Sequence, residues 1–84
     1  MIREYAAELA AQTGTQLSRA TVVDGKLLGC RDSHLLQLFS GEHMESALIF
    51  QSELDDLQNG IRRDRLEARI RTALSRLKIL SEPQ

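Results

Sequence analysis

The sequence predicts a single, mainly α-helical domain: a short N-terminal helix, a turn-rich middle and a C-terminal antiparallel helical hairpin. Three observations lead to this fold class. The 84 residues suffice for one domain. Apolar residues recur at intervals of three and four through residues 43–61 and again through 66–80, as in helices that pack along one face. The two stripes lose phase near Asn59-Gly60. The domain therefore divides into an N-terminal part (1–41), a helical hairpin (42–80) and a tail (81–84).

The first element is a helix over about residues 2–12. Ile2, Tyr5, Ala6 and Leu9 recur at helical spacing, which puts them on one face. Gln-Thr-Gly at residues 12–14 supplies a stop, because glycine tolerates the left-handed conformation that ends many helices.

The middle of the chain contains a β-turn signal. Asp24-Gly25 follows the β-favouring residues 21–23 and precedes Lys-Leu-Leu at 26–28. An Asp-Gly pair suits a type I′ turn, which needs positive φ at both central residues. We therefore predict a small β-hairpin over about 17–30, with an ordered loop around a tight turn as the alternative. Asp32-Ser33 then predicts a capped short helix through residues 34–39.

The C-terminal half predicts two helices that fold back on each other. The first stripe consists of His43, Ala47, Phe50, Leu54, Leu57 and Ile61; the second consists of Leu66, Ile70, Ala73, Leu77 and Leu80. The step from Ile61 to Leu66 is five residues, so one straight helix cannot keep both stripes on one face. We predict helices over about 42–58 and 61–80, with a longer bent helix as the alternative. Whether the hairpin closes within one chain or between two stays open.

Charge follows the same division. Residues 42–60 carry five acids and no Lys or Arg, whereas residues 61–80 carry seven bases and two acids. The net charge of −1 provides no global field toward nucleic acid or anionic membrane. We expect the charged flanks to select the register and the partner through Glu53, Asp56, Arg65, Arg69 and Arg76.

The leading functional hypothesis is a non-enzymatic protein–protein interaction module. It would be an adaptor, a chaperone-like protein or a regulatory subunit that binds itself or a protein partner by coiled-coil-like helix packing. A homodimer would cover the apolar residues that a two-helix hairpin leaves exposed. The predicted partner-binding residues are Phe50, Leu54, Leu57, Leu66, Ile70, Leu74 and Leu77.

Two other functional classes have less support from the sequence. A small nucleic-acid-associated regulator would use Arg62, Arg63, Arg65, Arg69 and Arg76. The neighbouring acids oppose a phosphate backbone, and no aromatic residues interleave these arginines to stack bases. An enzyme or metal protein would have to use Cys30, His34 and His43, which lack the paired spacing of zinc ligands. We expect no catalytic residue, metal or cofactor.

The sequence also predicts a cytoplasmic location. The single cysteine, Cys30, cannot form an intramolecular disulfide, which fits a reducing compartment. No apolar run approaches the roughly 20 residues that span a bilayer, so we expect no membrane partner.

Overall fold

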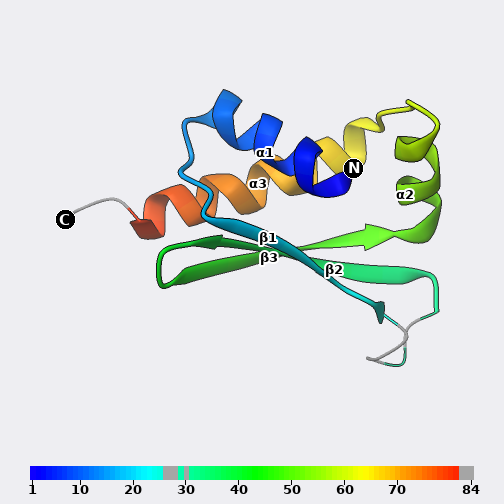
Figure 1. Cartoon of the computed structure of the whole chain (residues 1–84), viewed down its shortest axis with the longest axis horizontal. Helices are drawn as coiled ribbons and strands as arrows, with labels where there is room; N and C mark the ends of the chain where they lie inside the picture. Colours follow the sequence, from blue (N-terminus) through cyan, green and yellow to red (C-terminus); the bar gives the residue numbers. More distant parts are fainter. Residues whose placement is uncertain (26–28, 30, 82–84) are drawn as a thin grey trace.

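The chain folds as two layers, with helices on one side of an antiparallel sheet. The computed structural model describes residues 1–25, 29 and 31–81. Its elements are α1 (Ile2–Thr13), β1 (Arg19–Val23), β2 (Ser33–Ser40), β3 (His43–Phe50), α2 (Gln51–Gln58) and α3 (Asp64–Ser81). The three strands are ordered β1-β2-β3, and Figure 1 shows α1 and α3 together over one side of them. The fold class is therefore α+β, and the predicted mainly α fold is wrong.

The error lies in residues 33–50, where two predicted helices are instead an antiparallel β-hairpin. The predicted helix 34–39 lies in β2, and the first half of the predicted helix 42–58 is β3. Buried and half-buried residues alternate along β2 in the period of two that a strand requires. Both strands carry apolar residues on each face, which hid this period in the sequence. The same residues therefore satisfied a helical spacing.

A two-residue turn, Gly41-Glu42, joins β2 to β3. Ser40 and His43 are the pair that flanks it, and Gly41 has φ of +59°. Positive φ at this position is what the tight hairpin turns require, and glycine adopts it without steric cost. The boundary between two predicted helices, 34–39 and 42–58, falls at this turn.

The predicted hairpin over 17–30 is confirmed only in its first arm. That arm is β1, and its partner is β2, from Arg19 opposite Phe39 to Val23 opposite Leu35. The predicted second arm falls mostly on residues 26–28 and 30, which lie outside the described residues. Thus β1 pairs with a segment that the sequence assigned to a helix.

The C-terminal helices form no hairpin with each other. α2 packs against β3, and Figure 1 shows it turned across the end of the sheet, whereas α3 runs along the sheet beside α1. The helix break at Asn59-Gly60 is confirmed, as are α1 and, within a few residues at its start, the last helix. The chain therefore folds back onto its own sheet, and the strands supply the partner that the stripes require.

The hydrophobic core lies between the two layers. It contains Tyr5, Ala6, Leu9 and Ala10 of α1, Leu36, Leu38, Ala47 and Ile49 of the sheet, and Leu57, Leu66, Ile70, Ala73, Leu74 and Leu77 of α2 and α3. None of the helices in the described part of the chain is long and apolar enough to cross a membrane.

Candidate protein-interaction surface

The helices cover one face of the sheet, and the opposite face has no covering layer among the described residues. Side chains alternate between the two faces of a strand. Leu36, Leu38, Ala47 and Ile49 point into the core, so their neighbours point away from it. These neighbours form the open face: Arg19, Thr21 and Val23 of β1, Ser33, Leu35, Gln37 and Phe39 of β2, and Met44, Ser46, Leu48 and Phe50 of β3.

The pairing register arranges the open face in rows across the three strands. One row is Val23–Leu35–Leu48, and another is Arg19–Phe39–Met44. The row between them is Thr21–Gln37–Ser46, in which the Thr21 hydroxyl lies 3.2 Å from Gln37 Oε1. Two apolar rows therefore flank one polar row.

Large apolar side chains of this face are in contact with solvent. Met44 and Leu48 are each 45% exposed, and Phe50 is 43% exposed. Contiguous exposed apolar surface is uncommon on soluble monomers and commonly marks an interaction site. Exposed side chains of this kind on one strand make the open face the first candidate for a functional surface.

The open face carries little charge. Of the described residues that we place on it, only Arg19 is ionised, and its guanidinium carbon lies 4.3 Å from the centre of the Phe39 ring. At the other end of the face, the guanidinium carbon of Arg69 from α3 lies 5.2 Å from the centre of the Phe50 ring. Each arginine therefore covers an aromatic ring at the margin of the face. A surface of this composition suits an apolar protein partner better than a charged ligand.

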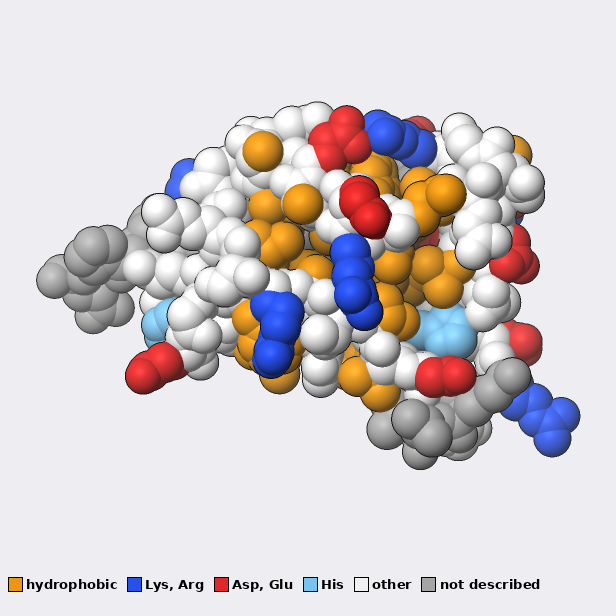
Figure 2. Space-filling view, viewed as in Figure 1, with side chains coloured by type: hydrophobic (Ala, Val, Ile, Leu, Met, Phe, Trp, Pro, Cys, Tyr) orange, Lys and Arg blue, Asp and Glu red, His pale blue; other side chains and the backbone are white. Residues whose placement is uncertain are grey.

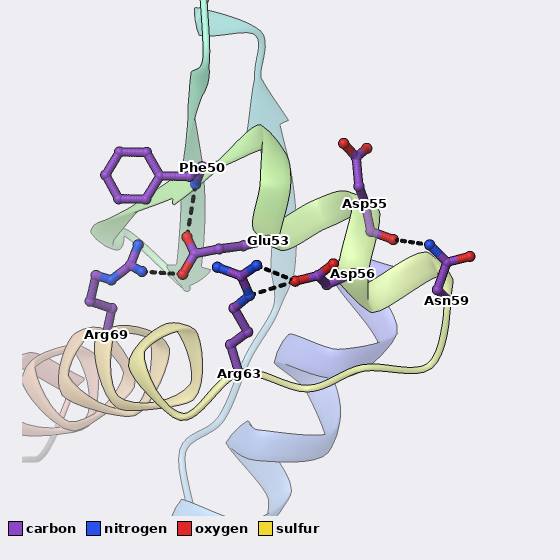
Figure 3. Close-up of polar contacts among 7 residues, drawn as sticks. All are labelled: Phe50, Glu53, Asp55, Asp56, Asn59, Arg63 and Arg69. Atoms are coloured by element: carbon purple, nitrogen blue, oxygen red, sulfur yellow. Dashed lines mark hydrogen bonds and ion pairs between the residues drawn. The ribbon is translucent and has the colours of Figure 1, made fainter.

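A half-buried ion pair closes one end of the β3 edge (Figure 3). Glu53 of α2 is only 4% exposed, and one of its carboxylate oxygens accepts the Phe50 N–H at 2.9 Å. The other carboxylate oxygen binds Arg69 of α3, whose guanidinium also donates to the Leu48 carbonyl at 2.5 Å. Glu53 and Arg69, which the sequence predicted to select a partner, thus join β3, α2 and α3 of the same chain.

The remaining predicted charge-selecting residues divide into paired and unpaired groups. Asp56 forms an ion pair with Arg63 at 2.5 Å, which Figure 3 also shows. Arg65 and Arg76 are exposed on α3 and have no ion pair within the described residues. Only these two arginines of the predicted set stay available to a partner.

Most of the predicted partner-binding residues serve the chain's own core. Leu57, Leu66, Ile70, Leu74 and Leu77 are each at most 6% exposed, and Leu54 packs half-buried against them. Phe50 alone of that set lies exposed, at the end of the open face. The helical stripes correctly indicated apolar packing, but the packing partner is the sheet.

The predicted set of partner-binding residues did not include Leu35, Phe39, Met44 and Leu48. A signal was present, because Leu35-Leu36, Leu38-Phe39 and Leu48-Ile49-Phe50 place apolar residues on consecutive positions. Such runs are typical of strands that are apolar on both faces, although a buried helix gives the same pattern.

His34 and His43 form no shared chemical site in the described residues. His34 is buried; its Nδ1 accepts the Gly25 N–H at 3.2 Å, and its Nε2 lies 2.5 Å from Gln51 Oε1. His34 therefore links the segment after β1 to the start of α2. His43 is exposed at the start of β3, and Cys30 lies outside the described residues. No group of three metal-ligating side chains occurs among residues 1–25, 29 and 31–81.

Ion pairs also occupy most of the arginines proposed for nucleic acid. Arg62 pairs with Glu8 at 3.0 Å, Arg63 pairs with Asp56, and Arg69 pairs with Glu53. On the side of the molecule seen in Figure 2, acidic and basic side chains are interspersed and do not gather into a patch of one sign. The face seen in Figure 2 therefore shows no basic patch that would bind a phosphate backbone.

Comparison of the chain with protein-family models, with curated proteins and with solved structures found no match.

Proposed function

We propose that this chain is a non-enzymatic protein-interaction module that self-associates through the open face of its sheet. The observation that carries the proposal is the exposure of Met44, Leu48 and Phe50 on a face that the chain's own helices leave uncovered. Burial of apolar surface contributes about 25 cal/mol per Å², so two such faces gain stability by packing together.

A second copy is the occupant that the composition of the face favours. Two nearly neutral faces meet without like-charge repulsion, and sheets that pack face to face form a common two-layer core. Gln37 lies in the middle of the polar row, and its amide nitrogen donates no hydrogen bond within the described residues. Facing polar rows would place this donor near acceptors of the second copy and would thereby set the register.

The size of the face sets the expected strength of this dimer. Strands of up to eight residues, with a rise of about 3.4 Å per residue and a separation of about 4.8 Å, give a footprint of roughly 350 Å². Two facing footprints total roughly 700 Å², which is below the range of about 1,200–2,000 Å² of stable specific interfaces and falls among weak, transient ones. We therefore expect a weak dimer, with a dissociation constant in the upper micromolar range. A cytoplasmic location is part of the proposal and rests on the single cysteine of the chain.

Sedimentation of the purified chain between about 1 and 500 μM tests the proposal. We expect a reversible monomer–dimer equilibrium that Met44→Asp abolishes, because the substitution would bury a carboxylate in the interface. The matched control is Ile79→Asp, which changes an apolar residue that is 69% exposed on α3, away from the open face. This control should dimerise as the parent does.

Circular dichroism should show that both variants keep the parental fold. A parent that stays monomeric throughout the concentration range would refute self-association. Equal effects of Met44→Asp and Ile79→Asp on the equilibrium would refute the open face as its site.

A further inference from the structure

A groove lies between β3 and α3, at the edge of the sheet. It has a volume of about 290 Å³ and is open to solvent. Its lining residues are Ser46, Ala47 and Leu48 of β3 and Ala68, Arg69, Thr72, Ala73 and Arg76 of α3. The side chains of α3 that line it are small except for the two arginines, so an extended chain has room to approach the strand.

Within the described part of the chain, the β3 edge presents unpaired backbone groups to this groove. In an antiparallel pair, alternate residues direct both their N–H and C=O groups toward the neighbouring strand or away from it. Side chains from outside the sheet reach the Leu48 carbonyl and the Phe50 N–H, so the even-numbered residues of β3 direct these groups to the edge. Met44 and Ser46 are also even-numbered, so their N–H and C=O groups point to the edge as well. Among residues 1–25, 29 and 31–81 these groups of Met44 and Ser46 have no hydrogen-bond partner, because the Arg69–Glu53 pair caps only the end of the strand.

The charge of the groove is positive. Arg76 lines it, is exposed and has no ion pair within the described residues. Arg69 also lines it but is paired with Glu53. None of the lining residues is acidic. An acidic side chain that entered the groove beside Ala47, on the helix side of the sheet, would therefore meet a cation already in place.

We propose that this groove binds an extended acidic segment of a partner protein, which adds to β3 as a fourth, antiparallel strand. Main-chain hydrogen bonds to Met44 and Ser46 would hold the strand, as in other cases of strand addition. Its alternate side chains would differ in character. Those on the helix side would be acidic and face Arg76, while those on the opposite side would be apolar and extend the open face.

A second copy of this chain fits the groove poorly. Symmetric pairing of two β3 strands would bring Arg69 and Arg76 of one α3 beside the same arginines of the other, and like charges in such contacts are destabilising. The inference is independent of self-association by the open face, because Arg76 lies on the helix side of the sheet. Each proposal can therefore fail while the other stands.

The test uses a fluorescent, end-blocked peptide of eight alternating Val and Glu residues, with binding followed by anisotropy. Arg76→Glu should weaken binding about tenfold or more, because it replaces attraction with repulsion. Arg65→Glu is the matched control, since it makes the same change on an exposed arginine of α3 outside the groove. It should change the dissociation constant by about twofold at most, and a Val–Lys peptide should not bind.

Selective N-methylation of the peptide tests strand addition and leaves the protein unaltered. In an antiparallel strand whose Glu side chains face α3, the Val residues direct their N–H groups toward β3. Methylation of the Val nitrogens should abolish binding, whereas methylation of the Glu nitrogens should leave it nearly unchanged. Equal binding of the two methylated peptides would overturn strand addition. An equal loss in Arg76→Glu and Arg65→Glu would overturn the groove as the site, as would failure of the parent to bind the peptide.

Discussion

The hydroxyl group of Tyr5 is buried in the core, and it has no hydrogen-bond partner among the described residues. The residue is 3% exposed, and the Arg62 guanidinium carbon lies 4.9 Å from the centre of its ring. Burial raises the pKa of the Tyr5 phenol, and the nearby Glu67 carboxylate raises it further. The ring therefore contributes packing, while the hydroxyl carries a desolvation cost.

We predict that Tyr5→Phe leaves the free energy of unfolding at pH 7 unchanged or raises it by about 1 kcal/mol, because it removes an unsatisfied polar group. Above pH 10.0, the ordinary pKa of tyrosine, the two proteins should diverge. The folded state holds the Tyr5 proton more tightly than the unfolded state does, so the parent loses stability as the pH rises. The variant lacks this loss.

Denaturant unfolding at pH 7 and at about pH 10.5 measures both effects. Tyr5 is the only tyrosine in the chain, so the difference between the two proteins isolates this group. A loss of more than about 1 kcal/mol at pH 7 in Tyr5→Phe would show that the hydroxyl has a stabilising partner.

At the scale of elements, the Glu53–Arg69 pair determines how α2 and α3 attach to the sheet. The Glu53 carboxylate accepts the Phe50 N–H at the junction of β3 and α2 and binds Arg69 on α3. It satisfies a backbone donor at a helix start, as a capping residue does. One buried carboxylate thus holds the point where the chain leaves the sheet.

We predict that Glu53→Ala lowers the free energy of unfolding by about 2 kcal/mol, because it leaves the Phe50 N–H without its acceptor and the half-buried Arg69 guanidinium without its counter-ion. Asp55→Ala is the matched control, since it removes an exposed carboxylate from the same helix and should cost less than about 0.5 kcal/mol. Urea unfolding of the three proteins gives the comparison. A similar loss of unfolding free energy in Glu53→Ala and Asp55→Ala would show that the Glu53–Arg69 pair contributes little to the attachment of α2.

At the scale of the whole molecule, the chain covers its sheet on one face only. The radius of gyration is 12.6 Å, and the core between the layers uses most of the large aliphatic residues. Other large apolar residues, including Met44 and Leu48, lie on the open face. Small domains bury a limited fraction of their surface, and oligomerisation is a common supplement to their stability.

We predict that the thermal midpoint of the parent rises with protein concentration, by about 2–4 °C for each tenfold increase above the dissociation constant. Association favours the folded state by mass action, so the effect requires a folded dimer. Calorimetry at several concentrations of the parent and of Met44→Asp measures it. A midpoint that does not change in the parent, or changes equally in Met44→Asp, would contradict dimerisation through the open face.

The sequence by itself determined the parts of the fold that depend on local interactions. The apolar spacing of α1 and its end at Gly14, where φ is +70°, could be read directly. The same holds for the break at Asn59-Gly60 and for the body of α3. In each case the residues that make or end the helix lie within a few positions of one another, so no distant contact is needed to specify it.

Only the tertiary structure decided between helix and strand for residues 33–50, and with it the candidate site. Apolar residues stand on both faces of β2 and β3, so their sequence fits either period. Pairing with β1 and coverage by α1 and α3 selected the strands. The register then decided that Ile49 lies in the core and Leu48 on the open face, and a slip of one residue would exchange them. Two adjacent aliphatic residues thus differ in role because of contacts with distant segments.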